Sequence, residues 1–261
     1  MLRAHMATYP AREAQMLKAV ESIRHQVDRV FVVLNEYGAA PDALHAMDNV
    51  DPILPSEDHK DTGKFLPQAD TDDEVFLVDD DMIFSPGYVA HMRDVAARTH
   101  ERRAVFGLHA SFMLHGFRRK GFDHRRIYNY RRAIKDCRVV DMVGTGTCYA
   151  HGRHLPPFSV MQEAVQFSDI RFALWCHRND ITRITLSRPE KLVQGQRTET
   201  TIYRTFTNKL PDAVFDEVKE FGRKDPRLRQ VIPLHTSTPA ALTHAAGSTE
   251  LDDAAAQSSK I

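Results

Sequence analysis

Short, continuous apolar runs alternate with helical stretches along the front half of the chain, and this alternation constrains the fold most. The runs at residues 29–34 and 75–78 consist almost entirely of Val, Leu and Phe, which is typical of strands buried on both faces of a parallel sheet. Residues 11–27 place four apolar side chains on one helical face, namely Met16, Val20, Ile23 and Val27. Strand and helix signals in turn predict an α/β fold.

Further elements follow the same rules. Ser85 followed by Pro86 is typical of a helix start, and we expect a helix over residues 87–98. The first strand, ahead of Thr8, is expected to be short or clipped, since few residues precede it. The remaining strands are predicted at residues 105–108, 139–143 and 184–186, and the remaining helices at 168–178 and 212–221.

One domain over residues 1–235 accommodates all these elements. Residues 236–261 are rich in Ala, Ser and Thr and hold few large apolar side chains, so we expect a flexible or loosely docked tail there.

Composition excludes several classes of protein. Lys and Arg together number 35 and so do Asp and Glu, so the chain lacks the global basic excess of a wholesale polyanion binder. No apolar run approaches the roughly 18 residues of a membrane span, and no secretory signal is visible at the start. The three cysteines form no Cys-x-x-Cys pair, which argues against a disulfide framework. A cytoplasmic protein is therefore expected.

Three aspartates, Asp79, Asp80 and Asp81, directly follow the apolar run at residues 75–78. Ligands of open α/β sheets bind beyond the carboxyl ends of the strands. Alternate residues of an extended segment point the same way, so Asp79 and Asp81 are expected to converge on one cation while Asp80 points elsewhere. Oxygen ligands in small number suit Mg²⁺ or Mn²⁺. The alternative is a solvated acidic turn.

Four segments together, in this order, make the sequence resemble a family-2-like glycosyltransferase with the GT-A fold. Residues 7–12 match a Thr-x-Pro-x-Arg opening, and residues 59–65 match an Asp-x-Gly-Lys-Phe segment. Residues 78–89 match an Asp-x-Asp metal motif followed by a helix. The fourth segment combines the Gly-Thr-Gly-Thr run of residues 143–151 with residues 167–170. The resemblance covers roughly residues 4–190 and has no clear counterpart for the Arg-rich middle.

The resemblance implies a mostly parallel GT-A sheet and transfer of a sugar from a nucleotide-diphosphate donor, with a UDP-sugar expected first. The acceptor would be a glycan or a lipid-linked glycan, the cofactor Mn²⁺ or Mg²⁺, and the reaction inverting. By the same resemblance, the chain is expected to act in surface or capsular polysaccharide synthesis, in the cytoplasm or at the inner face of the membrane. The zero net charge and the absence of a nucleic-acid-binding module argue against a nucleic-acid partner.

Residue roles implied by the resemblance fall into three groups. The expected donor or nucleotide contacts are Thr8, Pro10, Arg12, Asn35, Asp61, Lys64, Asp79 and Asp80. The expected metal ligands are Asp79 and Asp81. The expected sugar and acceptor pocket comprises Gly144, Thr145, Gly146, Thr147 and His151.

Each of these roles has a structural alternative. Arg12 is equally well explained by a salt bridge at a helix start, and Asp61 with Lys64 by a solvated pair in a turn. The Gly-Thr-Gly-Thr run also suits a tight turn, and His151 suits a structural or exposed histidine. That run matches neither Gly-x-x-x-x-Gly-Lys nor Gly-x-Gly-x-x-Gly, so both nucleotide fingerprints fail.

An inverting transferase needs a general base within hydrogen-bond reach of the acceptor hydroxyl, and a carboxylate suits that role. Asp169, at the start of the predicted helix over residues 168–178, is the candidate. The alternative is an ordinary acidic residue at a helix N-terminus. Asp141 and Glu163 are weaker rivals.

Residues 115–138 are dense in basic and aromatic side chains. They suit an acceptor loop that binds an anionic glycan or a phosphate-bearing lipid, or a solvated helical face. Binding of single-stranded nucleic acid is the least favoured interpretation of this segment.

Two other functions stay open. The first is a sugar-phosphate nucleotidyltransferase, which usually has a Gly-rich basic loop after its first strand, where this chain has Thr8 to Arg12. The second is a non-catalytic carbohydrate- or nucleic-acid-binding module.

Overall fold

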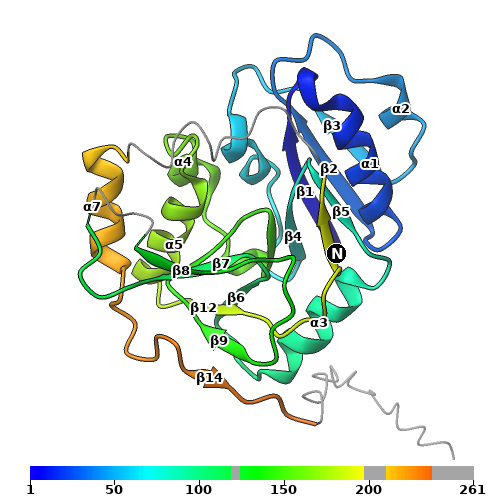
Figure 1. Cartoon of the computed structure of the whole chain (residues 1–261). Coiled ribbons are helices and arrows are strands. Elements are labelled where there is room, and N and C mark those ends of the chain that lie inside the picture. The colour runs from blue at the N-terminus through cyan, green and yellow to red at the C-terminus, as the bar shows by residue number, and fades with distance from the viewer. Residues whose placement is uncertain (119–123, 197–209, 237–261) are drawn as a thin grey trace, which may run out of the picture.

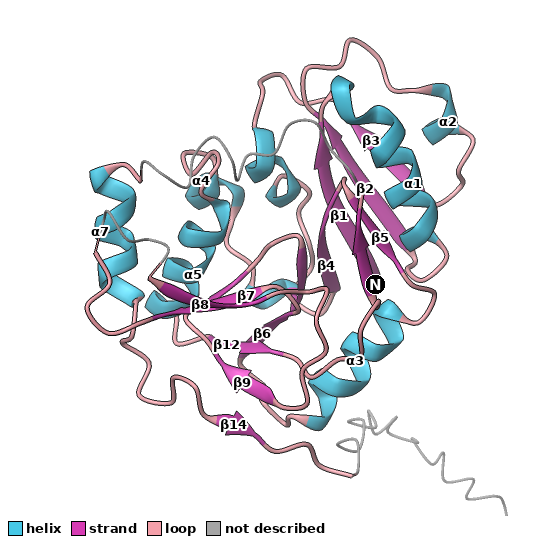
Figure 2. Cartoon of the chain, in the orientation of Figure 1, coloured by secondary structure: helices cyan, strands magenta, loops and turns pink. Residues whose placement is uncertain are grey.

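The computed structural model describes residues 1–118, 124–196 and 210–236. They form an α/β fold in which helices cover both faces of one large mixed sheet (Figures 1 and 2). The strand order in this main sheet is β14-β9-β12-β6-β11-β4-β1-β2-β3. The strands are β1 (Leu2–Thr8), β2 (Arg29–Leu34), β3 (Val50–Ile53), β4 (Glu74–Asp79), β6 (Ala104–Gly107), β9 (Cys137–Val139), β11 (Thr147–His151), β12 (Thr182–Thr185) and β14 (Val231–Ile232).

Most strands of the main sheet run in one direction. The pairs β2 with β3, β1 with β2, β1 with β4, and β6 with β12 are parallel. Strand β11 is antiparallel to both β4 and β6, and β9 is antiparallel to both β12 and β14. The carboxyl ends of β1, β2 and β4 therefore meet at one edge of the sheet, where the amino end of β11 also lies.

The two faces of β4 belong to two hydrophobic cores. Phe76 and Val78 pack with α1 (Glu13–Arg24) and α3 (Tyr88–Arg98) on one face. Val75 and Leu77 pack with α4 (Phe158–Met161) and α5 (Ser168–Arg178) on the other. All four side chains are completely buried, and each such burial contributes roughly 1.5–3 kcal/mol relative to exposure. The continuous apolar run at 75–78 thus reflects a strand covered on both sides.

Two smaller sheets complete the arrangement. Strands β10 (Met142–Val143), β7 (Ala110–Met113) and β8 (Arg125–Tyr128) form one antiparallel sheet. Strands β13 (Val193–Gly195) and β5 (Met82–Phe84) form the other. The β10-β7-β8 sheet shares a core with α5 and with α7 (Asp212–Phe221). Short helices are η1 (Pro10–Arg12), α2 (Asp42–His45), η2 (Lys60–Phe65) and η4 (Gly152–His154).

Several predicted elements are confirmed. Strand β2 and helices α5 and α7 have the bounds that the sequence predicts. Helix α1 lies within the predicted range 11–27, and β4 extends the predicted run by one residue at each end. The coarse fold class, a large and mostly parallel α/β sheet flanked by helices, is confirmed as well.

The first strand is not short, contrary to the prediction. Strand β1 has seven residues and pairs on both sides, with β2 and with β4. Two polar residues, Arg3 and His5, interrupt its apolar residues, so the sequence shows no continuous apolar run there. Arg3 is buried because its guanidinium pairs with Asp73 at 2.9 Å and donates from Nε to His5 Nε2 at 2.9 Å.

Two local predictions are wrong. Ser85 does not cap α3: the helix begins at Tyr88, and the Ser85 carbonyl, rather than its hydroxyl, accepts the Tyr88 amide at 2.9 Å. The predicted strand at 139–143 is divided between β9 and β10. Asp141 causes the break, because its buried carboxylate accepts the amides of Met113 and Arg223 at 2.7 and 2.8 Å.

The basic segment 115–138 is not a helical face in its described part. It contains β8, a turn around Asn129 and Arg132, and the start of β9, while residues 119–123 lie outside the described residues. The predicted tail lies outside them too, apart from Thr236. Within the described ranges, no helix combines the length and the apolar character needed to cross a bilayer.

Candidate active site

A cleft of about 620 Å³ opens at the edge of the main sheet where β1, β2 and β4 end. Thr8 closes β1, Asn35 follows β2 and Asp79 closes β4, and all three line the cleft. The start of α5 and the β10-β7-β8 sheet form the opposite walls. The cleft therefore lies where open α/β sheets bind their ligands.

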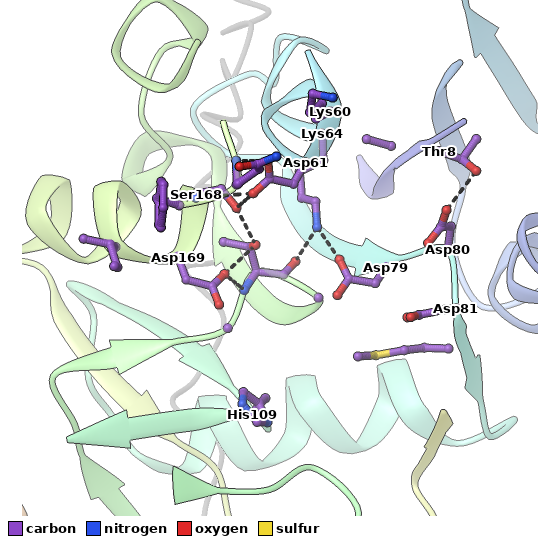
Figure 3. A pocket seen from close by; sticks show the side chains of 18 of the residues that line it. Thr8, Lys60, Asp61, Lys64, Asp79, Asp80, Asp81, His109, Ser168 and Asp169 are labelled. Carbon is purple, nitrogen blue, oxygen red and sulfur yellow. Dashed lines mark hydrogen bonds and ion pairs between the residues drawn. The ribbon is translucent and has the colours of Figure 1, made fainter. Parts of the chain in front are cut away.

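The acidic triplet divides into one structural and two accessible carboxylates. The side chain of Asp80 is 5% exposed and accepts hydrogen bonds from Thr8 Oγ1 at 2.9 Å and from Arg12 Nη1 at 2.6 Å. The side chains of Asp79 and Asp81 are 37% and 25% exposed and both line the cleft. Figure 3 shows Asp80 directed at Thr8 and Asp79 directed at Lys64.

Crowding of carboxylates affects the charge of the triplet. Burial, together with the nearby carboxylates of Asp79 and Asp80, raises the pKa of Asp81 to about 6. The guanidinium of Arg12, whose Nη1 lies 3.5 Å from Asp81 Oδ2, acts to lower that pKa but does not outweigh the other causes. Burial also raises the pKa of Asp80. Negative charge at this edge of the cleft is therefore incompletely compensated by the side chains around it.

Lys64 connects three parts of the cleft. Its side chain is 3% exposed, and its Nζ forms an ion pair with Asp79 and approaches the Thr145 carbonyl at 3.5 Å. Burial acts to lower the pKa of Lys64, but the Asp79 carboxylate outweighs it and raises the pKa. This ammonium therefore stays charged between the acidic triplet and the Gly-Thr-Gly-Thr turn. The solvated pair that was the alternative for Lys64 is excluded.

Asp61 has a scaffolding position in this structure. Its Oδ1 accepts the Gln166 amide at 2.6 Å, and its Oδ2 accepts the Ser168 hydroxyl at 2.6 Å. One carboxylate oxygen is therefore engaged with the turn before α5 and the other with the first residue of that helix. Desolvation raises the pKa of Asp61 despite these hydrogen bonds. Although Asp61 lines the cleft, it acts on the start of α5.

Asp169 stands across the cleft from the triplet, in the first turn of α5 (Figure 3). Its Oδ1 accepts two hydrogen bonds from Thr145, one from the amide at 2.8 Å and one from the hydroxyl at 2.7 Å. Its Oδ2 has no hydrogen-bond partner among the described residues. One oxygen thus fixes the side chain, and the other is available to a ligand.

The residues near the start of the chain separate into two sets. Thr8, Arg12 and Asn35 line the cleft, but Pro10 is exposed and does not. Arg12 makes the salt bridge that was one of its two alternatives, with Asp80 as partner. Asn35 accepts the His59 amide at 2.9 Å and donates to the Lys60 carbonyl at 3.0 Å. It therefore fastens the segment ahead of η2 to the end of β2.

Three members of the Gly-Thr-Gly-Thr run lie at the cleft: Gly144, Thr145 and Gly146. Thr147 does not, because it is completely buried and its hydroxyl accepts the His109 amide at 2.9 Å. His151 is at the wrong end of β11 for a pocket residue. It pairs in register with Glu74, the first residue of β4, whereas Asp79 is the last, a separation of about 17 Å at roughly 3.3 Å per residue.

Sequence reasoning missed the wall formed by the β10-β7-β8 sheet and the turn after it. This wall contributes His109, Ser111, Arg125, Tyr130 and Met142 to the cleft. No local motif marks these residues, since they come together only through the pairing of β7 with β8 and β10. The dense basic and aromatic character of residues 115–138 was the single signal that pointed to Arg125 and Tyr130. The rival base candidates Asp141 and Glu163 do not line the cleft.

Asp79 and Asp81 are the carboxylates that could hold a metal ion here. No group of three or more His, Cys, Asp or Glu side chains within the described ranges is arranged for a metal. Mg²⁺ is commonly held by one or two carboxylates and completed by water and substrate phosphates. Two accessible carboxylates beside an open cleft fit that kind of site, in which the substrate supplies the missing ligands.

No protein-family model matches the sequence, and a search of curated proteins finds no significant relative.

Proposed function

We propose that the chain is a metal-dependent glycosyltransferase with the GT-A fold that transfers a sugar from a nucleotide-diphosphate donor, with inversion, to a glycan or lipid-linked acceptor. One observation carries the proposal: Asp79 and Asp81 at the strand edge and Asp169 on α5 line the same cleft. The strand order, with β11 antiparallel between β4 and β6, is compatible with that fold. The resemblance in sequence suggests surface or capsular polysaccharide synthesis and a UDP-sugar donor.

The acidic edge supports the donor side of this proposal. A divalent cation on Asp79 and Asp81 would supply charge neutralisation for the leaving diphosphate. Lys64, held between Asp79 and Thr145, places a second positive charge beside the same position. Thr8 and Asn35 border the part of the cleft where β1 and β2 end, which suits the nucleoside.

Asp169 supports the acceptor side. Thr145 fixes its Oδ1, so Oδ2 is oriented to take the proton from the attacking acceptor hydroxyl. The new glycosidic bond forms as the bond between the anomeric carbon and the diphosphate breaks. Gly144 and Gly146 keep this part of the cleft free of side chains, so that a sugar can approach the backbone closely.

The test is nucleotide release from a panel of nucleotide-sugars, with Mn²⁺ and with mixed glycan acceptors. Asp169→Asn should lower transfer at least a hundredfold, the scale of general-base catalysis, and leave the donor Kd unchanged. Glu163→Gln is the matched control, because Glu163 is exposed and lies outside the cleft. A donor Kd that weakens in Asp169→Asn while turnover stays normal contradicts the base assignment. No release with any nucleotide-sugar contradicts the function.

A further inference from the structure

The wall of the cleft opposite the acidic triplet has the opposite chemical character. It is built by the β10-β7-β8 sheet, the residue just before β7 and the turn after β8, and its polar members at the cleft are His109, Ser111, Arg125 and Tyr130. No Asp or Glu of that wall lines the cleft within the described residues. The cleft is thus acidic where β4 ends and basic and aromatic across from it, with Asp169 bordering the space between.

His109 lines the same cleft as Asp169 and Asp79 (Figure 3). Its amide donates to Thr147 Oγ1 at 2.9 Å, and its carbonyl accepts the Gly144 amide at 2.8 Å. These two bonds fix His109 to the turn whose Thr145 holds Asp169. Its ring packs edge-on against Tyr130, with ring centroids 6.0 Å apart. Its Nδ1 is buried and has no hydrogen-bond partner among the described residues, which is costly unless a ligand satisfies it.

Arg188 holds the turn that carries Tyr130. The guanidinium is buried, and it donates to the carbonyls of Asn129 at 2.8 Å and of Arg132 at 3.1 Å. Its other acceptors, Thr185 Oγ1 and the Leu186 carbonyl, are neutral as well. Burial lowers the pKa of Arg188 to about 10, and no carboxylate in the described part of the chain forms an ion pair with it.

Positive charge from this wall reaches the cleft. Burial lowers the pKa of His109, and the charges of Arg125 and Arg188 add to that effect, while Asp169 and Asp79 oppose it. Arg125 itself lines the cleft from β8. An anion placed here would satisfy the buried Nδ1 of His109 and would gain from the charge of Arg188, which is buried where screening by solvent is weak. Arg125 lines the same cleft and has a partner of its own, and its guanidinium offers several N–H donors that the anion can share.

We propose that the acceptor of the transfer is an anionic glycan, whose carboxylate or phosphate binds at Arg125 and His109 while its attacking hydroxyl faces Asp169. This inference rests on the proposed function and adds the class of acceptor to it. Tyr130 gives the neighbouring sugar ring an aromatic face to pack on. The donor diphosphate at the acidic edge is itself an anion, so the charged group of the acceptor is favoured at the opposite wall, and this sets the direction of the acceptor in the cleft.

Equilibrium binding of labelled oligosaccharides to the full chain, in saturating UDP and Mn²⁺ at fixed ionic strength, tests this. The probes are a tetrasaccharide with uronate carboxylates, the same tetrasaccharide with those carboxyls reduced to alcohols, and a phosphorylated tetrasaccharide. The uronate or the phosphorylated probe should bind at least tenfold more tightly than the reduced one, and the comparison of the two charged probes identifies which anion is preferred.

Arg125→Gln should remove that preference, and Arg125→Lys should keep part of it because the charge remains. Arg126→Gln is the matched control: it removes the same charge from the adjacent residue of β8, which is exposed and does not line the cleft. If Arg126→Gln has the same effect as Arg125→Gln, only the overall charge matters and the assignment is wrong.

Two further outcomes separate this inference from the proposed function. Equal binding of charged and reduced probes, with normal UDP binding, overturns the anionic acceptor and leaves the transferase intact. A weaker UDP Kd in Arg125→Gln would assign the basic wall to the donor and also overturn it. If no nucleotide diphosphate binds in the presence of Mn²⁺, the transferase itself fails and the acceptor assignment fails with it.

Discussion

The carboxylate of Asp79 lies directly against the backbone of Gly146. A Cβ atom at position 146 would overlap the Asp79 carboxyl group, so the end of β4 and the Gly-Thr-Gly-Thr turn are in contact only because residue 146 has no side chain. The same carboxylate forms the ion pair with Lys64. The position of Asp79 therefore depends on a glycine that is 67 residues away in sequence (146 − 79).

Gly146→Ala should displace Asp79 and separate it from Lys64. We expect Mn²⁺-dependent UDP binding to weaken at least tenfold, measured by calorimetric titration. Gly38→Ala is the control, because a Cβ at position 38 meets nothing within 4 Å, and its UDP Kd should equal that of the wild type. A wild-type Kd in Gly146→Ala would show that Asp79 is not needed in its present position.

Lys64→Met removes the ammonium and retains most of the side-chain volume. Asp79 then loses its partner, and we expect the free energy of unfolding to fall by about 1–3 kcal/mol, less than for a fully buried pair because Asp79 reaches solvent. Urea unfolding measures this. Lys60→Met is the control: the Lys60 side chain is 47% exposed and that of Lys64 only 3%, so the effect of Lys60→Met should stay within about 1 kcal/mol. Equal effects of the two substitutions would contradict the role given to Lys64.

Asp61→Asn separates a scaffolding role from a nucleotide contact. The amide keeps one acceptor oxygen, so one of the two hydrogen bonds to Gln166 and Ser168 is lost and the start of α5 shifts. We expect transfer to fall about tenfold, as is reasonable for a misplaced catalytic group, with the UDP Kd unchanged. A weaker UDP Kd with normal transfer would instead favour the nucleotide contact that the sequence resemblance implies.

Asp81 makes the stability of the metal-free protein depend on pH. Its folded-state pKa of about 6 lies above the ordinary value of 3.8, so the folded chain holds this proton more tightly than the unfolded chain does. Its contribution to stability is therefore present at low pH and is lost as the pH rises from about 4 to about 6. Urea unfolding between pH 4 and pH 8 should show that decline in the wild type and a shallower one in Asp81→Asn. Parallel profiles would contradict the raised pKa.

Much of the fold could be predicted from local patterns. The sequence shows β2 and β4 as apolar runs, and it shows α1 and α5 by the helical spacing of their apolar residues. These elements can be recognised locally because the residues that bury them are apolar and lie within the element itself. Strand β1 was expected to be short because few residues precede Thr8. Its polar Arg3 gave no apolar signal against that expectation, since Arg3 is buried through Asp73, a partner 70 residues away. The division between β9 and β10 depends likewise on Asp141, whose partners lie far away along the chain.

In the candidate site, too, some residues could be predicted from local patterns and others depend on contacts between distant parts of the chain. Asn35 and the acidic triplet come at the ends of apolar strands and Thr8 ends β1, and the rule for the carboxyl ends of strands brings them together. His151 was misplaced because the sequence does not reveal that β11 runs antiparallel and carries it away from the cleft. His109 and Arg125 reach the cleft through the pairing of β7 with β8. No sequence motif predicts that pairing.

The central claim is that Asp79 and Asp81 bind a divalent cation that holds a nucleotide diphosphate. Thermal unfolding of the full chain with UDP, alone and with Mn²⁺, tests it most directly, since a ligand that binds only the folded state stabilises it by RT ln(1 + [L]/Kd), about 2.7 kcal/mol at a hundredfold excess over Kd. We predict a rise in Tm with UDP and Mn²⁺ together that exceeds the sum of the separate effects, and its loss in Asp81→Ala. An undiminished joint effect in Asp81→Ala, or none in the wild type, would contradict the claim.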